Sequence, residues 1–206
     1  MAQYFYIHPE NPQLRLIQQA VAIIKRGGVI AYPTDSAYAL GCQLDNKEAL
    51  ERLRRIRHLD EHHPMTLICK DLSHLSTYAR VDNQVYRLLK AHTPGPYTFI
   101  LQATSEVPRR LHHPKRKTIG LRVPDNAIVT ALLQALEAPL VSTTLVLSDQ
   151  DGPAGDAEVL KDLLQHQVDL IIDGGHVVVH PTSVVDLSTD LVEIIREGAG
   201  DLSAFR

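Results

Sequence analysis

Apolar residues near the start of the chain follow helical spacing and then strand spacing. Four of them recur at intervals of three and four, namely Leu14, Ile17, Val21 and Ile24. This spacing predicts a helix, which Gly27-Gly28 ends. The run from Val29 to Tyr32 is rich in β-branched and aromatic residues and predicts a strand, which Pro33 ends.

The same helical spacing recurs four more times along the chain. Each of these segments begins at or beside an aspartate, a residue type that caps helix N-termini. The expected helices begin at Asp45, at Asp82, at Pro124-Asp125 and at Asp156. Pro139 ends the third of them.

Short apolar runs between these helices predict further strands. They cover Thr66–Cys69, Tyr97–Leu101, Thr118–Val123, Leu140–Leu147, Asp169–Asp173, Ser183–Leu187 and Val192–Arg196. The polar, glycine-containing stretch Ser148–Gly155 is expected to be a loop. About seven or eight strands mixed with five or six helices indicate an α/β fold. No internal repeat or composition break appears, so residues 1–206 are expected to form one domain.

Composition narrows the class of protein. The chain has 206 residues, 44% of them hydrophobic, and a formal net charge of -3. This balance excludes a disordered chain and a globally basic nucleic-acid coat, but a local basic patch remains possible. No apolar run approaches the roughly 18 residues that span a bilayer, and no secretory signal is visible. We therefore expect a cytoplasmic protein with no membrane partner.

Common signatures of metal, nucleotide and hydrolase sites are absent from the sequence. Cys42 and Cys69 form no CxxC pair, and no HExxH is present, so no metal site is expected. The chain also lacks GxxxxGK[ST], a GxGxxG between a strand and a helix, and GxSxG. These patterns identify no catalytic residue.

The segment Ala31–Gly41, AYPTDSAYALG, is the most informative stretch of the sequence. It follows a strand and carries hydroxyls, a carboxylate and a tyrosine where the chain must change direction. Polar loops at strand ends are frequent ligand sites in α/β proteins. The alternative is an Asx-type turn without a binding function.

This segment resembles the YPT[DE]TxYGLG loop of the YrdC/YciO family, which is threonylcarbamoyl-adenylate synthase-like. Other family motifs have counterparts in the same order, in Thr93–Phe99, Ile119–Pro124, Pro139–Thr144, Asp173–Gly175, Pro181–Asp186 and Ile195–Gly198. The stretches Phe5–Pro9 and Cys69–Tyr78 are similar to the YciO branch of that family. The resemblance extends over about residues 15 to 200, and the shared order is more specific than any single motif.

The resemblance implies a YrdC-like twisted sheet, mostly parallel and partly mixed, flanked by helices, with a large basic concave cavity. Family members condense L-threonine, bicarbonate and ATP into threonylcarbamoyl-adenylate and pyrophosphate, for the threonylcarbamoyladenosine modification of tRNA. Mg²⁺ would accompany ATP, and no tightly bound cofactor is implied. The fold is also associated with binding of double-stranded RNA.

The resemblance also assigns residues to ligands. The positions matching the threonine site are Thr34, Arg122, Thr143 and Thr182. Those matching the nucleotide site are Arg57, His63, Thr118, Thr144, Leu145 and Arg196. An arginine grips a carboxylate with two parallel hydrogen bonds, which suits Arg122. The alternatives are a structural ion pair for Arg122 and a surface charge for Arg196.

The nucleotide positions depart from the family pattern. Leu59 replaces an arginine, His63 replaces a lysine, and Val146 replaces an asparagine. Each charge-assisted hydrogen bond lost to a phosphate costs about 1.5 to 3 kcal/mol. Synthase chemistry at reduced efficiency is therefore expected, and whether the protein is an enzyme stays open.

Two basic segments suggest RNA as a partner. One helix carries Arg52, Arg54 and Arg55, and a later stretch carries Arg109, Arg110, Lys115, Arg116 and Lys117. Clustered cations bind the phosphates of tRNA or duplex RNA. The alternative for these cations is a solvated surface. A non-catalytic RNA-binding protein and a sensor of a small acid or nucleotide are the competing functions.

Overall fold

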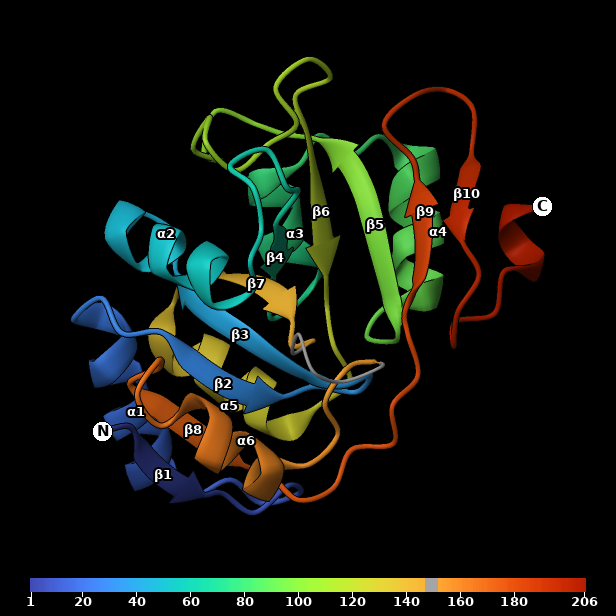
Figure 1. The fold of residues 1–206 in the computed structure, drawn as a ribbon. Helices are drawn as coiled ribbons and strands as arrows, with labels where there is room; N and C mark the ends of the chain where they lie inside the picture. The colour runs from blue at the N-terminus through green and yellow to red at the C-terminus, as the bar shows by residue number, and fades with distance from the viewer. Residues whose placement is uncertain (147–151) are drawn as a thin grey trace.

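The computed structural model describes residues 1–146 and 152–206. Its strands form one ten-stranded sheet in the order β1-β8-β2-β3-β7-β4-β6-β5-β9-β10. The strands are β1 (Gln3–Tyr6), β2 (Ile30–Pro33), β3 (Tyr38–Gln43), β4 (Thr66–Ile68), β5 (Tyr97–Gln102), β6 (Thr118–Arg122), β7 (Leu140–Thr144), β8 (Leu170–Asp173), β9 (Ser183–Asp186) and β10 (Glu193–Arg196). Figure 1 shows the strong twist between the two ends of this sheet. The twisted α/β fold predicted from the sequence is confirmed.

The sheet is mixed rather than mostly parallel. Strand β8 pairs in parallel with β1 and β2, and β4–β6 and β5–β9 are parallel as well. The other pairings, among them β2–β3 and β3–β7, are antiparallel. We expected most strand pairs to be parallel, and this is wrong. A short turn joins β2 directly to β3, and only an antiparallel pair allows so short a connection.

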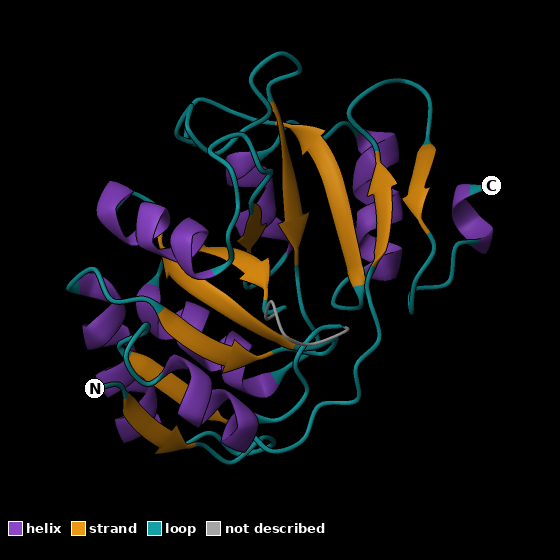
Figure 2. Cartoon of the chain, in the orientation of Figure 1, coloured by secondary structure: helices purple, strands orange, loops and turns teal. Residues whose placement is uncertain are grey.

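Helices cover both faces of the sheet (Figure 2). They are α1 (Leu14–Lys25), α2 (Lys47–Ile56), α3 (Leu72–Tyr78), α4 (Asn83–His92), α5 (Ala127–Leu136) and α6 (Ala157–Leu164), with a final 3-10 turn at Ser203–Phe205. Alternate strand residues enter opposite cores: Ile30 and Tyr32 pack with α1 and α5, whereas Ala31 packs on the side of α2 and α6. The sheet is therefore the middle layer.

Caps explain where several helices begin. Asp82 and Asp156 accept hydrogen bonds from the first turns of α4 and α6, as the sequence predicted. The residues beside Asp45 and Asp125 cap the other two: Asn46 accepts from Ala49 N, and Asn126 from Val129 N. Those two starts were predicted one residue early.

Three elements escaped the sequence analysis. Strand β1 is a half-exposed edge strand, α3 is only seven residues long, and β3 occupies the second half of the segment Ala31–Gly41. That segment is therefore a β-hairpin with a tight turn rather than a long loop. Strand β7 ends at Thr144, short of its predicted end, and the first half of the predicted loop Ser148–Gly155 lies outside the described residues.

Candidate functional site

The turn between β2 and β3 presents buried hydroxyls at the end of two central strands. The Thr34 hydroxyl donates to Ala37 O at 2.7 Å and accepts from Ser36 N at 3.1 Å. Pro33 ends β2 just before this turn. Thr34 is 2% exposed and Ser36 4%, so both hydroxyls are fixed by the turn itself. Ser36 was not among the predicted site residues.

Arg122 stands at the end of β6, directly against this turn. Its Nη2 pairs with Asp35 Oδ1 at 2.5 Å, and its Nη1 donates to Ser36 Oγ at 3.1 Å. The second carboxylate oxygen of Asp35 accepts from Asp125 N at 3.0 Å. The ion pair considered as the alternative for Arg122 therefore exists, and it holds the guanidinium in one orientation.

The guanidinium of Arg122 has spare donors. Arg122 is 6% exposed, and its Nε–H is buried with no acceptor among the described residues. Burial lowers the pKa of Arg122, and the Asp35 carboxylate opposes that shift. A buried donor without a partner costs about 1 to 3 kcal/mol, so an incoming carboxylate oxygen is favoured here.

A cavity of about 530 Å³ opens above Arg122. Hydroxyl side chains dominate its polar wall, with an apolar wall that includes Met65, Ile68 and Ile100. Among the described residues that line it are cations and imidazoles but no carboxylate. The predicted site residues that line it are Thr34, Arg122, Thr143, Thr182, His63, Thr118, Thr144, Arg196 and Arg116. Such a cavity favours anionic ligands.

Arg196 crosses from the edge strand β10 to the cavity. Its Nε donates to Thr182 O and its Nη2 to Thr182 Oγ1, both at 3.0 Å. The Thr182 hydroxyl is in turn 3.0 Å from that of Thr98 on β5. Arg196 is thus oriented by neighbouring groups rather than loose at the surface. Thr98 was not predicted, because nothing in its strand pattern distinguishes a cavity-facing threonine.

A smaller hollow of about 270 Å³ adjoins the cavity and shares His63, Thr144 and Arg196 with it. Arg57, just after α2, lies here and donates to the main-chain oxygens of Thr144, at 2.8 Å, and Val146. Burial lowers the pKa of Arg57. The end of β7 therefore holds this cation at one side of the site.

The departures from the family pattern occupy different places. Val146 lines the small hollow with Arg57, whereas Leu59 lines a separate groove beyond α2. His63 is exposed and borders all three hollows. Burial and the nearby Arg57 lower its pKa, which Asp60 opposes. Leu145 contributes no side chain, because it is buried in the core and its main-chain N–H donates to Tyr38 O. Its predicted contact with the nucleotide stays a prediction.

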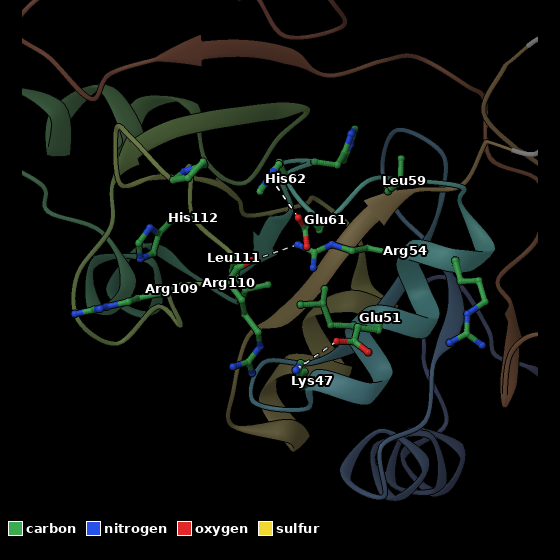
Figure 3. A pocket seen from close by; sticks show the side chains of 14 residues that line it. Lys47, Glu51, Arg54, Leu59, Glu61, His62, Arg109, Arg110, Leu111 and His112 are labelled. Atoms are coloured by element: carbon green, nitrogen blue, oxygen red, sulfur yellow. Dashed lines mark hydrogen bonds and ion pairs between the residues drawn. The ribbon is translucent and has the colours of Figure 1, made fainter.

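The five cations predicted for RNA do not form one patch. All are exposed on the segment 103–117. Arg109 and Arg110 line the groove beyond α2 (Figure 3), while Arg116 lines the cavity and pairs with Asp186 at 3.3 Å. Lys115 and Lys117 line none of these hollows.

The donor set does not suit a protein-held Mg²⁺. Mg²⁺ prefers carboxylate and other oxygen ligands in octahedral geometry. Across residues 1–146 and 152–206, no group of three His, Cys, Asp or Glu side chains converges as a metal site. Any Mg²⁺ at this cavity would therefore be brought by the phosphates of its ligand.

Comparison with known proteins identifies the family of this chain. Residues 22–198 match the Sua5/YciO/YrdC family model, which is described as telomere recombination. The chain belongs to the Sua5/YciO/YrdC family. It is 57% identical to the uncharacterized protein YciO of Escherichia coli K12 over all of both chains, and the crystal structure of E. coli YciO superposes with a TM-score of 0.96.

Two other members of the family carry functional names. The threonylcarbamoyl-AMP synthase of Vibrio vulnificus YJ016 is 33% identical, over 88% of this chain and 98% of its own. P. abyssi Sua5, solved in complex with L-threonine, has the same fold with a TM-score of 0.87 at 23% identity, over 95% of this chain and 57% of its own.

No helix in the described part of the chain is long and apolar enough to cross a membrane.

Proposed function

We propose that the cavity binds L-threonine and ATP and forms threonylcarbamoyl-AMP with release of pyrophosphate, more slowly than the named synthases. The observation that carries this proposal is Arg122. It is buried, aligned by Asp35 and Ser36, and keeps an unpaired Nε–H beside a cavity whose described lining has no carboxylate. A guanidinium held in this way favours a carboxylate, the group that every amino acid carries.

The proposed reaction divides between the two ends of the site. Threonine's amine and bicarbonate form a carbamate with loss of water. A carbamate oxygen then attacks the α-phosphorus of ATP, and the bond to pyrophosphate breaks. Arg57 and Arg196 stabilise the phosphate charges, and the hydroxyls of the cavity wall replace water around the labile carbamate.

Two named relatives support this assignment. One is a threonylcarbamoyl-AMP synthase that matches this chain at 33% identity, and the other was solved with L-threonine. A reduced rate is expected from Val146 in the small hollow and from Leu59 at the groove beyond α2, since neither side chain donates a hydrogen bond to a phosphate.

The test is incubation of the pure protein with ATP, bicarbonate, Mg²⁺ and L-threonine. Pyrophosphate and threonylcarbamoyl-AMP are both quantified, the latter by mass spectrometry. Both products should appear above a heat-killed control, and neither should appear with Arg122→Met. The matched control is Arg87→Gln, an exposed arginine on α4. Absence of both products from the wild-type protein contradicts the proposal.

RNA binding is a second candidate function, favoured by the exposed cations of the segment 103–117. Binding to tRNA or duplex RNA should weaken as salt rises and fall when Lys115, Arg116 and Lys117 become Ala. No binding at low salt, or binding that the triple substitution leaves unchanged, refutes this function.

A further inference from the structure

A second hollow, the basic groove, lies between α2 and the segment 103–117 and encloses about 670 Å³ (Figure 3). Arginines reach it from both sides: Arg54 and Arg55 from α2, Arg109 and Arg110 from the facing segment. The groove is separate from the cavity of the proposed function, but His63 lines both.

The positive charge of the basic groove is only partly compensated. Lys47 and the four arginines line it together with two carboxylates, Glu51 and Glu61. None of the four arginines forms an ion pair with any described residue, and Glu51 lies 3.7 Å from Lys47. The groove therefore carries an excess of positive charge.

Two of the four arginines are nevertheless held in position. Arg54 Nη2 donates to Arg110 O at 3.1 Å, and Arg110 Nη2 donates to Leu44 O at 3.2 Å. Main-chain carbonyls orient these side chains but do not neutralise them. Figure 3 shows the Arg54 side chain facing the loop segment that carries Arg110, on the other side of the groove.

Two buried nitrogens at this groove have no partner among the described residues. They are Arg54 Nε and His112 Nδ1, which come from opposite sides of the groove. Buried polar groups in native proteins are nearly always paired, so water or a small ligand between the two sides would supply the partners of these nitrogens.

We propose that the basic groove binds a condensed phosphate, that is, two or three linked phosphate groups. Planar guanidinium forks match the oxygens of phosphate, and several arginines suit a compact ligand with several negative charges. A ligand with a single carboxylate would leave most of these cations without a counter-charge. An RNA duplex is too wide to enter between the two sides of the groove and reach the buried nitrogens.

The source of the condensed phosphate rests on the proposed function. Because His63 borders the groove and the cavity, the groove receives either pyrophosphate released in the cavity or the phosphate tail of bound ATP. The two sources share one chemistry, and titration separates them.

The experiment is isothermal titration of the full chain in magnesium-free buffer with pyrophosphate, orthophosphate and a non-hydrolysable ATP analogue. Pyrophosphate should bind at least tenfold more tightly than orthophosphate. The double variant Arg55→Gln with Arg109→Gln should weaken pyrophosphate binding tenfold or more. Both side chains are exposed and make no side-chain hydrogen bond to a described residue, so this variant should fold. Arg87→Gln is the matched control.

The readouts separate this proposal from the proposed function. Pyrophosphate binding without any synthase product supports the groove and refutes the reaction. Weakened pyrophosphate alone identifies the released product as the ligand, and weakened ATP analogue as well identifies the tail of ATP. The groove proposal is overturned if wild-type protein gives no heat with pyrophosphate or if the double variant binds pyrophosphate unchanged. It is also overturned if, in a parallel titration with duplex RNA, the double variant loses affinity for the RNA alone.

Discussion

Arg122 in the cavity and Arg57 in the adjoining small hollow are held in different ways. Arg122 is buried and paired with a carboxylate, whereas Arg57 is half-buried and held by two main-chain oxygens. The first arrangement fixes orientation and compensates the charge, and the second fixes orientation alone. Under the proposed function, the threonine end is therefore ordered before any ligand arrives, while the nucleotide end keeps the charge of Arg57 and has Val146 where the family pattern has an asparagine.

The largest expected effect concerns the pair at the ordered end. Arg122→Met leaves the Asp35 carboxylate, whose side chain is 11% exposed, without its counter-charge. Breaking a buried pair in this way should reduce the free energy of unfolding by about 3 to 5 kcal/mol, measured by urea denaturation. A variant as stable as wild type shows that the pair does not organise this end.

A double variant separates stability from binding at the same place. Arg122→Met with Asp35→Asn removes both charges and should recover most of the lost stability. L-threonine binding, followed by titration calorimetry, should remain lost. Recovery of threonine binding in the double variant contradicts the role of Arg122 as the carboxylate partner.

The next effect tests what the nucleotide end lacks. Leu59→Arg with Val146→Asn supplies two phosphate donors and should raise threonylcarbamoyl-AMP synthesis about a hundredfold or more. The control places the same substitutions on the exposed Leu191 and Val178, where no gain is expected. No gain in the test variant means that the nucleotide end serves another reaction.

A smaller effect is expected from the cation that the nucleotide end retains. Arg57→Gln should weaken ATP binding about tenfold and leave threonine binding unchanged, because Arg57 lies beside the small hollow rather than at Arg122. Calorimetry with each ligand separately gives both numbers. Equal losses for both ligands refute the division of the site into two ends.

The smallest effect is a pH dependence at His63. Its pKa is lowered from 6.5, so the imidazole is neutral at pH 7 and gains charge only below pH 6.5. ATP affinity should rise a few-fold as pH falls through that region, because the protonated ring attracts phosphate. His63→Gln should remove this rise. The free energy of unfolding without ATP changes in the opposite direction. It decreases as pH falls, because His63 binds a proton more readily in the unfolded chain than in the folded one.

Much of the fold was predictable because it rests on local rules. The helix containing Leu50 and Leu53 and the strand at Thr118 follow from residue spacing alone. The starts at Asn46 and Asn126 were displaced by one residue because Asp and Asn are both good caps and only the chain path selects between them. Strand β3 was missed because its residues are nearly all buried, so no alternation marks it.

Site residues were predictable where a motif carried them. Thr34, Arg122, Thr182 and Arg196 line one cavity, as the resemblance implied. The direction of the Leu145 side chain, which enters the core, was not predictable because position in a motif does not specify which way a side chain points. Asp35 and Thr98 were missed since their roles arise only from contacts across the sheet.

By itself the sequence determined the family, the α/β alternation and the residue types that a carboxylate and phosphates require. These depend on local order along the chain, which sequence records directly. Tertiary structure decided that Arg122 is paired with Asp35, and that the basic segments separate into the cavity and the basic groove. Charge compensation depends on distances between residues remote in sequence, and those distances exist only in the folded chain.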